Sequence, residues 1–339
     1  MVANRIVSLD VAKAICIILV VIGHYVPDNS PEWYVAIHDV IYTFHMPLFM
    51  FASGFVYIAT KKNESYGTFI LKKVKRLMIP YISTSVIVIT IKLLTQGNMS
   101  VDNPVTIMSY VKMLYSPEAG YFLWFIWALW WMFVVVSLMK TAKSRLILFF
   151  LAVIVHFVPL NLPEVFCIPQ FKNMLVYFML GVVCFESKAI HSFIRNFHFG
   201  KVVVSVLLFI VFEYITLANT GMTSIKNITS IMLPYIGILF VLEISKLICK
   251  YKSLDKGSIL ILISSSSYII YLFHTTFEGF AKAVCRKLPL DSNLTYIFVP
   301  EVIAVVGCGV VIPIILYKYV FVRYAITRVL FGLGKARNK

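Results

Sequence analysis

Residues 7–26, VSLDVAKAICIILVVIGHYV, form an apolar run that is long enough to cross a membrane as a single helix. The rest of the chain has the same character, because 60% of its 339 residues are hydrophobic and only 14% are charged. Soluble domains typically carry about 45–50% apolar and about 25% charged residues, so a water-soluble fold could not bury this much apolar surface. We therefore expect an integral membrane protein.

Apolar runs separated by charged residues or by Pro, Gly and Asn predict an all-α fold, a polytopic membrane helix bundle of about ten transmembrane helices. The longest connection, 96–120, is expected to be a loop, and no stretch between the spans is long enough for a second domain. Residues 1–339 are therefore expected to form a single integral membrane domain. The expected spans are 7–26, 38–59, 77–95, 121–139, 145–160, 170–186, 201–218, 228–246, 258–278 and 296–322.

The distribution of lysine and arginine predicts the orientation of the bundle. If the N-terminus lies in the cytoplasm, most of the 31 Lys and Arg residues fall in connections on that side, as the positive-inside rule requires. Both termini are then cytoplasmic, and the net charge of +16 calls for no nucleic-acid partner. The six cysteines are scattered singly without metal-ligand spacing, so no metal is expected.

Three polar residues interrupt the first span. His24 follows Lys13 by 11 positions. At about 100° per residue, this spacing brings the two side chains within about 20° of one helix face. Asp10 precedes Lys13 by one helical turn, which is close enough for an ion pair. A lysine that snorkels to the headgroups and a histidine wetted at the helix end would explain two of these residues without a function.

Histidines in two other spans favour a functional interpretation of these polar residues. His38 and His45 share one face of the second span, and they approach the depth of His24 from the outer side. His274, near the outer end of the ninth span, is expected in the same layer. Ionisable groups inside spans are candidates for functional sites, and three spans that each bring a histidine to one depth favour such a site.

Several motifs resemble those of the membrane acyltransferase-3 family, over essentially the whole chain. Ser8-Leu9-Asp10, Lys13 and Val20-Val21-Ile22-Gly23-His24 resemble its opening signature, and residues 44–55, FHMPLFMFASGF, resemble the second signature of its fucose 4-O-acetylase-like branch. The family usually has arginine where this chain has Lys13. Lysine also occurs in that branch, but it lacks the planar fork that binds phosphate in a bidentate manner. Weaker similarities are found at 75–81, 123–126, 177–181 and 267–274.

The resemblance implies transfer of an acyl group, most often acetyl, from cytoplasmic acetyl-CoA or another acyl-CoA to a carbohydrate hydroxyl. The acceptor is expected to be a cell-surface or lipid-linked sugar. The enzyme is expected to be an O-acetyltransferase that lies in the bacterial inner membrane and is surrounded by membrane lipids. A sugar hydroxyl is a poor nucleophile, so an imidazole that takes its proton would accelerate the attack. His24 is the expected general base, and His45 or Ser53 would orient it or stabilise the oxyanion. The expected site residues are His24 and His45 for catalysis, Lys13 and Arg76 for acyl-CoA, and Asp10, Ser53, Tyr268 and His274 in support.

Two interpretations without transferase chemistry stay open. A transporter or exporter of a sugar or other small solute would also have many spans, intramembrane ionisable residues and proline-broken helices. Transporters often consist of two similar halves, and no internal repeat is evident by eye in this sequence. A structural or sensor protein would leave the stripe formed by Lys13 and His24 unexplained.

Overall fold

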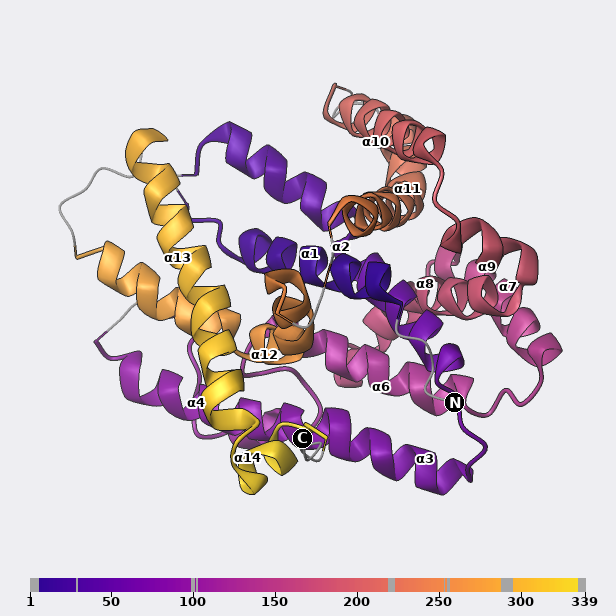
Figure 1. Cartoon of the computed structure of the whole chain (residues 1–339). Coiled ribbons are helices and arrows are strands. Elements are labelled where there is room, and N and C mark those ends of the chain that lie inside the picture. The colour runs from indigo at the N-terminus through magenta and orange to yellow at the C-terminus, as the bar shows by residue number, and fades with distance from the viewer. Residues whose placement is uncertain are drawn as a thin grey trace. The chain divides into compact units, whose positions relative to one another are not determined.

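The computed structural model describes residues 6–28, 30–98, 101, 103–218, 223–252, 254, 257–287 and 295–334, with only the backbone at 223–227 and 295. Helices account for all the regular secondary structure in these ranges (Figure 1). The all-α prediction is therefore confirmed. The basic residues at 1–5 and 335–339 lie outside the described residues.

The chain divides into two compact units that alternate along the sequence. Unit 1 comprises residues 1–61, 177–267 and 291–306, and unit 2 comprises residues 62–176, 268–290 and 307–339. Three of the five boundaries between the units fall inside helices, namely α8 (Ile168–Glu186), α12 (Ile259–Cys285) and α13 (Thr295–Leu316). The expectation of one integral membrane domain stays a prediction.

Unit 1 is built around α2. Its complete helices are α1 (Val7–His24), α2 (Glu32–Ala59), α9 (Lys188–Arg195), α10 (Phe199–Ala218) and α11 (Thr223–Tyr251). Both α1 and α11 pack on α2, and α10 lies beside α11 (Figure 1).

Unit 2 contains shorter helices and two π-helical turns. Its first long segment runs from α3 through a π-helical turn into α4, and α6 packs against the start of that segment. The helices and turns are α3 (Tyr66–Lys73), the π-turn Val74–Met78, α4 (Ile79–Thr95), α5 (Ser109–Lys112), the 3₁₀ turn Tyr121–Leu123, α6 (Trp124–Val136), α7 (Ala142–Phe157), the 3₁₀ turn Val165–Cys167, the π-turn Tyr317–Phe321 and α14 (Ala325–Leu330).

Eight helical segments among the described residues are long and apolar enough to cross a membrane. A helix also covers the two other expected spans, but Tyr121–Val136 and α7 are shorter. A polytopic membrane helix bundle is thus confirmed, whereas its ten crossings and its orientation stay predictions. The eight segments are Val7–His24, Glu32–Ala59, Tyr66–Thr95, Val165–Glu186, Phe199–Ala218, Ile228–Tyr251, Ile259–Cys285 and Tyr296–Phe321.

Small residues set how closely the helices of unit 1 approach α2. A Cβ atom at Gly54 would lie 1.9 Å from the Phe178 carbonyl oxygen, and one at Gly181 would lie 2.1 Å from the Phe51 carbonyl oxygen. The two glycines therefore let the backbones of α2 and α8 touch, as small residues do where membrane helices cross. At the crossing with α11, a Cβ atom at Gly237 would lie 2.3 Å from the Cβ atom of Phe44.

The structure corrects the start of the third span. The helical segment begins at Tyr66 rather than at residue 77, because the Ser65 hydroxyl accepts a hydrogen bond from the Thr68 amide and caps α3. The basic residues at 72–76 therefore lie on a helix and its π-turn rather than on a loop. The interval 96–120 contains one short helix, α5, so it is not wholly a loop.

Candidate active site

The polar residues near the start of α1 form a connected group. The Lys13 ammonium lies 2.8 Å from the Asp10 carboxylate, so the predicted ion pair is confirmed. The Ser264 hydroxyl, on the part of α12 that belongs to unit 1, donates to the same carboxylate at 3.3 Å. Asp10 is buried, whereas 31% of the Lys13 side chain is exposed. This arrangement holds the ammonium in place and leaves part of the Lys13 side chain exposed.

His24 is the last residue of α1, at the other end of the helix. Sixteen residues separate it from Ser8, which corresponds to about 24 Å along the helix axis. The chain leaves the helix at Tyr25, which is extended, and the His24 side chain is exposed. A Cβ atom at Gly23 would lie 2.9 Å from Cε2 of Tyr42. Glycine at this position therefore lets the Tyr42 ring pack closely beside the end of α1.

Tyr42 stands among three histidine rings, which we call the histidine cluster: His24, His38 and His45. The centre of the Tyr42 ring lies 4.1 Å from that of His38, 4.7 Å from that of His45 and 6.3 Å from that of His24. The predicted shared face of His38 and His45 is therefore confirmed, since both rings contact Tyr42. The cluster joins the end of α1 to α2 within unit 1. Of its three histidines, His24 is exposed, His38 is half-buried and His45 is buried, so the cluster is reachable from outside at His24.

The hydrogen bond of His45 determines its tautomer. Nδ1 lies 2.8 Å from the carbonyl oxygen of Ile41, one turn earlier on α2. A carbonyl oxygen only accepts, so Nδ1 must carry the proton, and Nε2 of the neutral ring is then a lone-pair acceptor. The His45 ring is buried, with 4% of the residue exposed. In this form, His45 can accept a proton or a hydrogen bond, but it cannot donate one to an oxyanion.

Two carboxylates that the sequence motifs do not indicate accept hydrogen bonds from residues adjacent in the sequence to the histidine cluster. The Tyr25 hydroxyl donates to Glu301 of α13 at 2.7 Å. The Thr43 hydroxyl lies 3.0 Å from an oxygen of Glu213, a buried residue of α10. Each is an acidic residue in an otherwise apolar helix, so the rule that selected Asp10 would also have found them.

Ser53 does not join the histidine cluster. It lies eight residues after His45 on α2, or about 12 Å along the axis, which is farther than one hydrogen bond can reach.

Tyr268 and His274 belong to unit 2, where α12 continues. The Nδ1 atom of His274 lies 2.9 Å from the Tyr271 carbonyl oxygen, and its ring packs edge-on against Phe122. The Tyr271 hydroxyl in turn donates to the Phe122 carbonyl at 2.7 Å. The hydroxyl of Tyr268 is buried. His274 therefore has well-defined packing of its own within unit 2, and its expected place in one layer with His24 stays a prediction.

Arg76 lies on the π-turn that joins α3 to α4, and turns of this kind are frequent at functional sites. Two of the three lysines at 72–75 have partners, because Lys72 pairs with Glu64 and the Lys73 ammonium lies 3.5 Å from the centre of the Phe133 ring, whereas Lys75 is exposed like Arg76. Arg76 is exposed, and within the described ranges its guanidinium has no carboxylate partner. It is therefore available to bind an anion.

No group of three or more His, Cys, Asp or Glu side chains in the described part of the chain is arranged to hold a metal ion. The histidine cluster is also not arranged as a metal site. Its three rings surround the phenol ring of Tyr42 and do not converge on a common point.

Comparison with known proteins gives these features a context. The family model for the acyltransferase-3 group, described as an acyltransferase domain, matches residues 6–318, a range that includes α1, α2 and the basic π-turn. The chain belongs to this family. The family resemblance seen in the sequence motifs is thereby confirmed.

Two curated relatives carry the name nodulation protein NolL. The protein from Mesorhizobium japonicum is 28% identical over 186 residues, which cover 52% of this chain and 47% of the relative. The protein from Sinorhizobium fredii is 28% identical over 185 residues, which cover 52% of this chain and 48% of the relative. The chain thus spans about half the length of the curated relatives it matches. No solved structure matches the chain significantly.

Proposed function

We propose that the protein is a membrane O-acetyltransferase that moves an acetyl group from cytoplasmic acetyl-CoA to a hydroxyl of a carbohydrate. Membership of the acyltransferase family supports the reaction class. The observation that carries the proposal is the histidine cluster, in which an exposed imidazole and a buried, oriented one meet around Tyr42. The acceptor is a cell-surface or lipid-linked sugar, and the enzyme lies in the bacterial inner membrane.

His24 acts as the general base in this mechanism. Its imidazole takes the proton of the sugar hydroxyl while the oxygen attacks the thioester carbonyl carbon. The tetrahedral intermediate then collapses, the bond from carbon to sulfur breaks, and the thiolate of coenzyme A leaves with a proton. The products are a sugar ester and free coenzyme A. His45, with Nε2 as an acceptor, orients His24 or the hydroxyl.

Two cationic residues, one in each unit, are assigned to the donor. Lys13 and Arg76 carry the charges that would meet the phosphates of acyl-CoA, and both are accessible. Because His24 lies about 16 Å further along α1 than Lys13, the pantetheine arm must extend between the helices to bring the thioester to the histidine cluster. An outer acceptor could thus be acylated by an inner donor.

Ligand-induced thermal stabilisation of the purified protein tests the donor. Acetyl-CoA and coenzyme A should raise the melting temperature of the wild type. Arg76→Ala should weaken this effect, and Lys13→Arg should retain or strengthen it, because a guanidinium binds phosphate in a bidentate manner. Indifference of the wild type to every acyl-CoA would contradict the proposal and favour a transporter.

A further inference from the structure

A pocket opens at the start of α1, at the opposite end of that helix from His24. The empty space in it, counted together with the open solvent at its mouth, is about 420 Å³, and all of its walls come from unit 1. Apolar and aromatic side chains form most of the lining, and none of the lining residues is acidic. The lining residues are Ile6, Ser8, Leu9, Phe51, Phe55, His191, Ile194, Arg195, Leu242 and Lys246.

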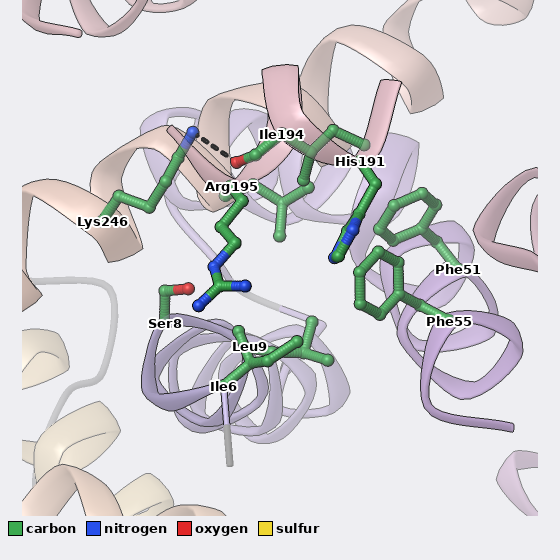
Figure 2. Close-up of a pocket in the computed structure, with 10 residues that line it drawn as sticks. Ile6, Ser8, Leu9, Phe51, Phe55, His191, Ile194, Arg195 and Lys246 are labelled. Atoms are coloured by element: carbon green, nitrogen blue, oxygen red, sulfur yellow. Dashed lines mark hydrogen bonds between the residues drawn. The ribbon is translucent and has the colours of Figure 1, made fainter. Parts of the chain in front are cut away.

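Two cationic side chains line this pocket, and they differ in one respect. The Lys246 ammonium pairs with Glu243 and donates to the Ile194 carbonyl at 2.8 Å, so its charge is already neutralised. Arg195, at the end of α9, is exposed, and among the described residues its guanidinium has neither a hydrogen bond nor an ion pair. Figure 2 shows this guanidinium extending from α9 into the pocket toward Ser8. The pocket therefore has one uncompensated positive charge.

Aromatic rings form the wall beside that charge. The His191 ring centre lies 5.7 Å from that of Phe55 and 4.9 Å from that of Phe185. Figure 2 shows His191 and the rings of Phe51 and Phe55 on the same side of the pocket. A guanidinium can bind phosphate oxygens in a bidentate manner, and planar rings next to it can stack on an aromatic base. This combination suits a phosphate that is attached to a heterocycle.

We propose that this pocket binds the nucleotide part of the acyl-CoA donor, with Arg195 as the anchor of its phosphates. The inference rests on the proposed function, which supplies the donor. It adds a binding group that the motifs of the chain did not indicate, because α9 lies between spans and carries no signature. An anionic lipid headgroup shares the phosphate chemistry, but it has no base to stack on the rings.

Binding to the purified full-length protein in a neutral detergent tests the proposal. Thermal stabilisation is titrated with coenzyme A, with pantetheine, which lacks phosphate, and with micelles containing phosphatidylglycerol. The variants are Arg195→Ala, Arg195→Gln and, as a matched control, Lys188→Ala, which removes a charge from the same helix outside the pocket. Arg195→Gln serves if the alanine variant does not fold.

Loss of the guanidinium should weaken the affinity for coenzyme A by about ten- to a hundredfold, as expected for a charge-assisted hydrogen-bonded contact. Lys188→Ala should change the affinity for coenzyme A by less than about threefold, and pantetheine should bind the wild type and the Arg195 variants equally.

Equal affinity of wild type and Arg195 variants for coenzyme A would overturn the assignment of this pocket to the nucleotide and leave the proposed function standing. An Arg195 effect confined to phosphatidylglycerol would assign the pocket to lipid and overturn the proposal. If coenzyme A does not stabilise even the wild type, the donor and the pocket both fail.

Discussion

His45 shows how one hydrogen bond decides the role of a side chain. The sequence alone is compatible with two roles for His45, which either orients the base or stabilises the oxyanion. Its bond from Nδ1 to the Ile41 carbonyl leaves only an acceptor at Nε2 of the neutral ring. Stabilising an oxyanion requires a donor, so the structure favours the orienting role. Spacing alone placed His45 on the correct face, but it could not determine the tautomer.

A pair of substitutions separates the two nitrogens of His45. His45→Asn places an amide where Nδ1 donates and removes Nε2, whereas His45→Gln places an amide oxygen near Nε2. We expect the Asn variant to insert normally and to lose acylation by about 10²-fold or more, and the Gln variant to keep part of the activity. Acetylation of surface glycans and the melting temperature of the purified variants are the measurements. Wild-type acetylation by His45→Asn would show that Nε2 is not used.

Glu213 and Glu301 mark what sequence reasoning left out at this scale. Both are single acidic residues in apolar helices, and each accepts a hydrogen bond from a residue next to the histidine cluster, Thr43 or Tyr25. The predicted site rests mainly on the ionisable residues of the first span and on the histidines, and it includes neither glutamate. The hydrogen bonds themselves could not be predicted from the sequence. Thr43 and Tyr25 are far from Glu213 and Glu301 along the chain, and only the packing of α10 and α13 brings each pair together.

At the scale of elements, the positions of helices followed from apolar runs, but their ends did not. The third span was expected to begin at residue 77, because the run before it is rich in lysine. The Ser65 cap and the interactions of Lys72 and Lys73 with Glu64 and Phe133 keep that basic stretch helical. The sequence also does not predict α9, because a short helix with one polar face contains no apolar run long enough to be recognised as a span.

The crossing of α2 and α8 yields a stability prediction. Gly54→Ala would push a methyl group against the backbone at Phe178, at a distance of 1.9 Å. Overpacking of this kind costs about 1–3 kcal/mol, so the melting temperature of the purified protein should fall clearly. Gly200→Ala, on α10, is the matched control, because no atom lies within 4 Å of the added Cβ. Equal melting temperatures for the two variants would contradict the close contact of α2 with α8.

At the scale of the whole molecule, the membrane orientation is the expectation that reporter fusions can test. The start of α1 and the end of α9 line one pocket, as two cytoplasmic ends should. Fusions after Asn196 and Lys339 should therefore report the cytoplasm, and fusions after Asp28 and Asn103 the outside. Lys339 itself lies outside the described residues. Reporters after Asp28 and Asn196 that indicate the same side would contradict the predicted topology of unit 1.

The central claim is that His24 is the base of an acetyl transfer to a glycan. Its most direct test is the mass of glycans released from cells that lack the gene and are complemented with the wild type or with His24→Ala. The wild type should restore a glycan heavier by one acetyl group. A general base contributes about 10²–10⁴-fold, so the variant should restore almost none, while it still inserts and is stabilised by acetyl-CoA. A correctly inserted His24→Ala protein that restores normal acetylation would contradict the account.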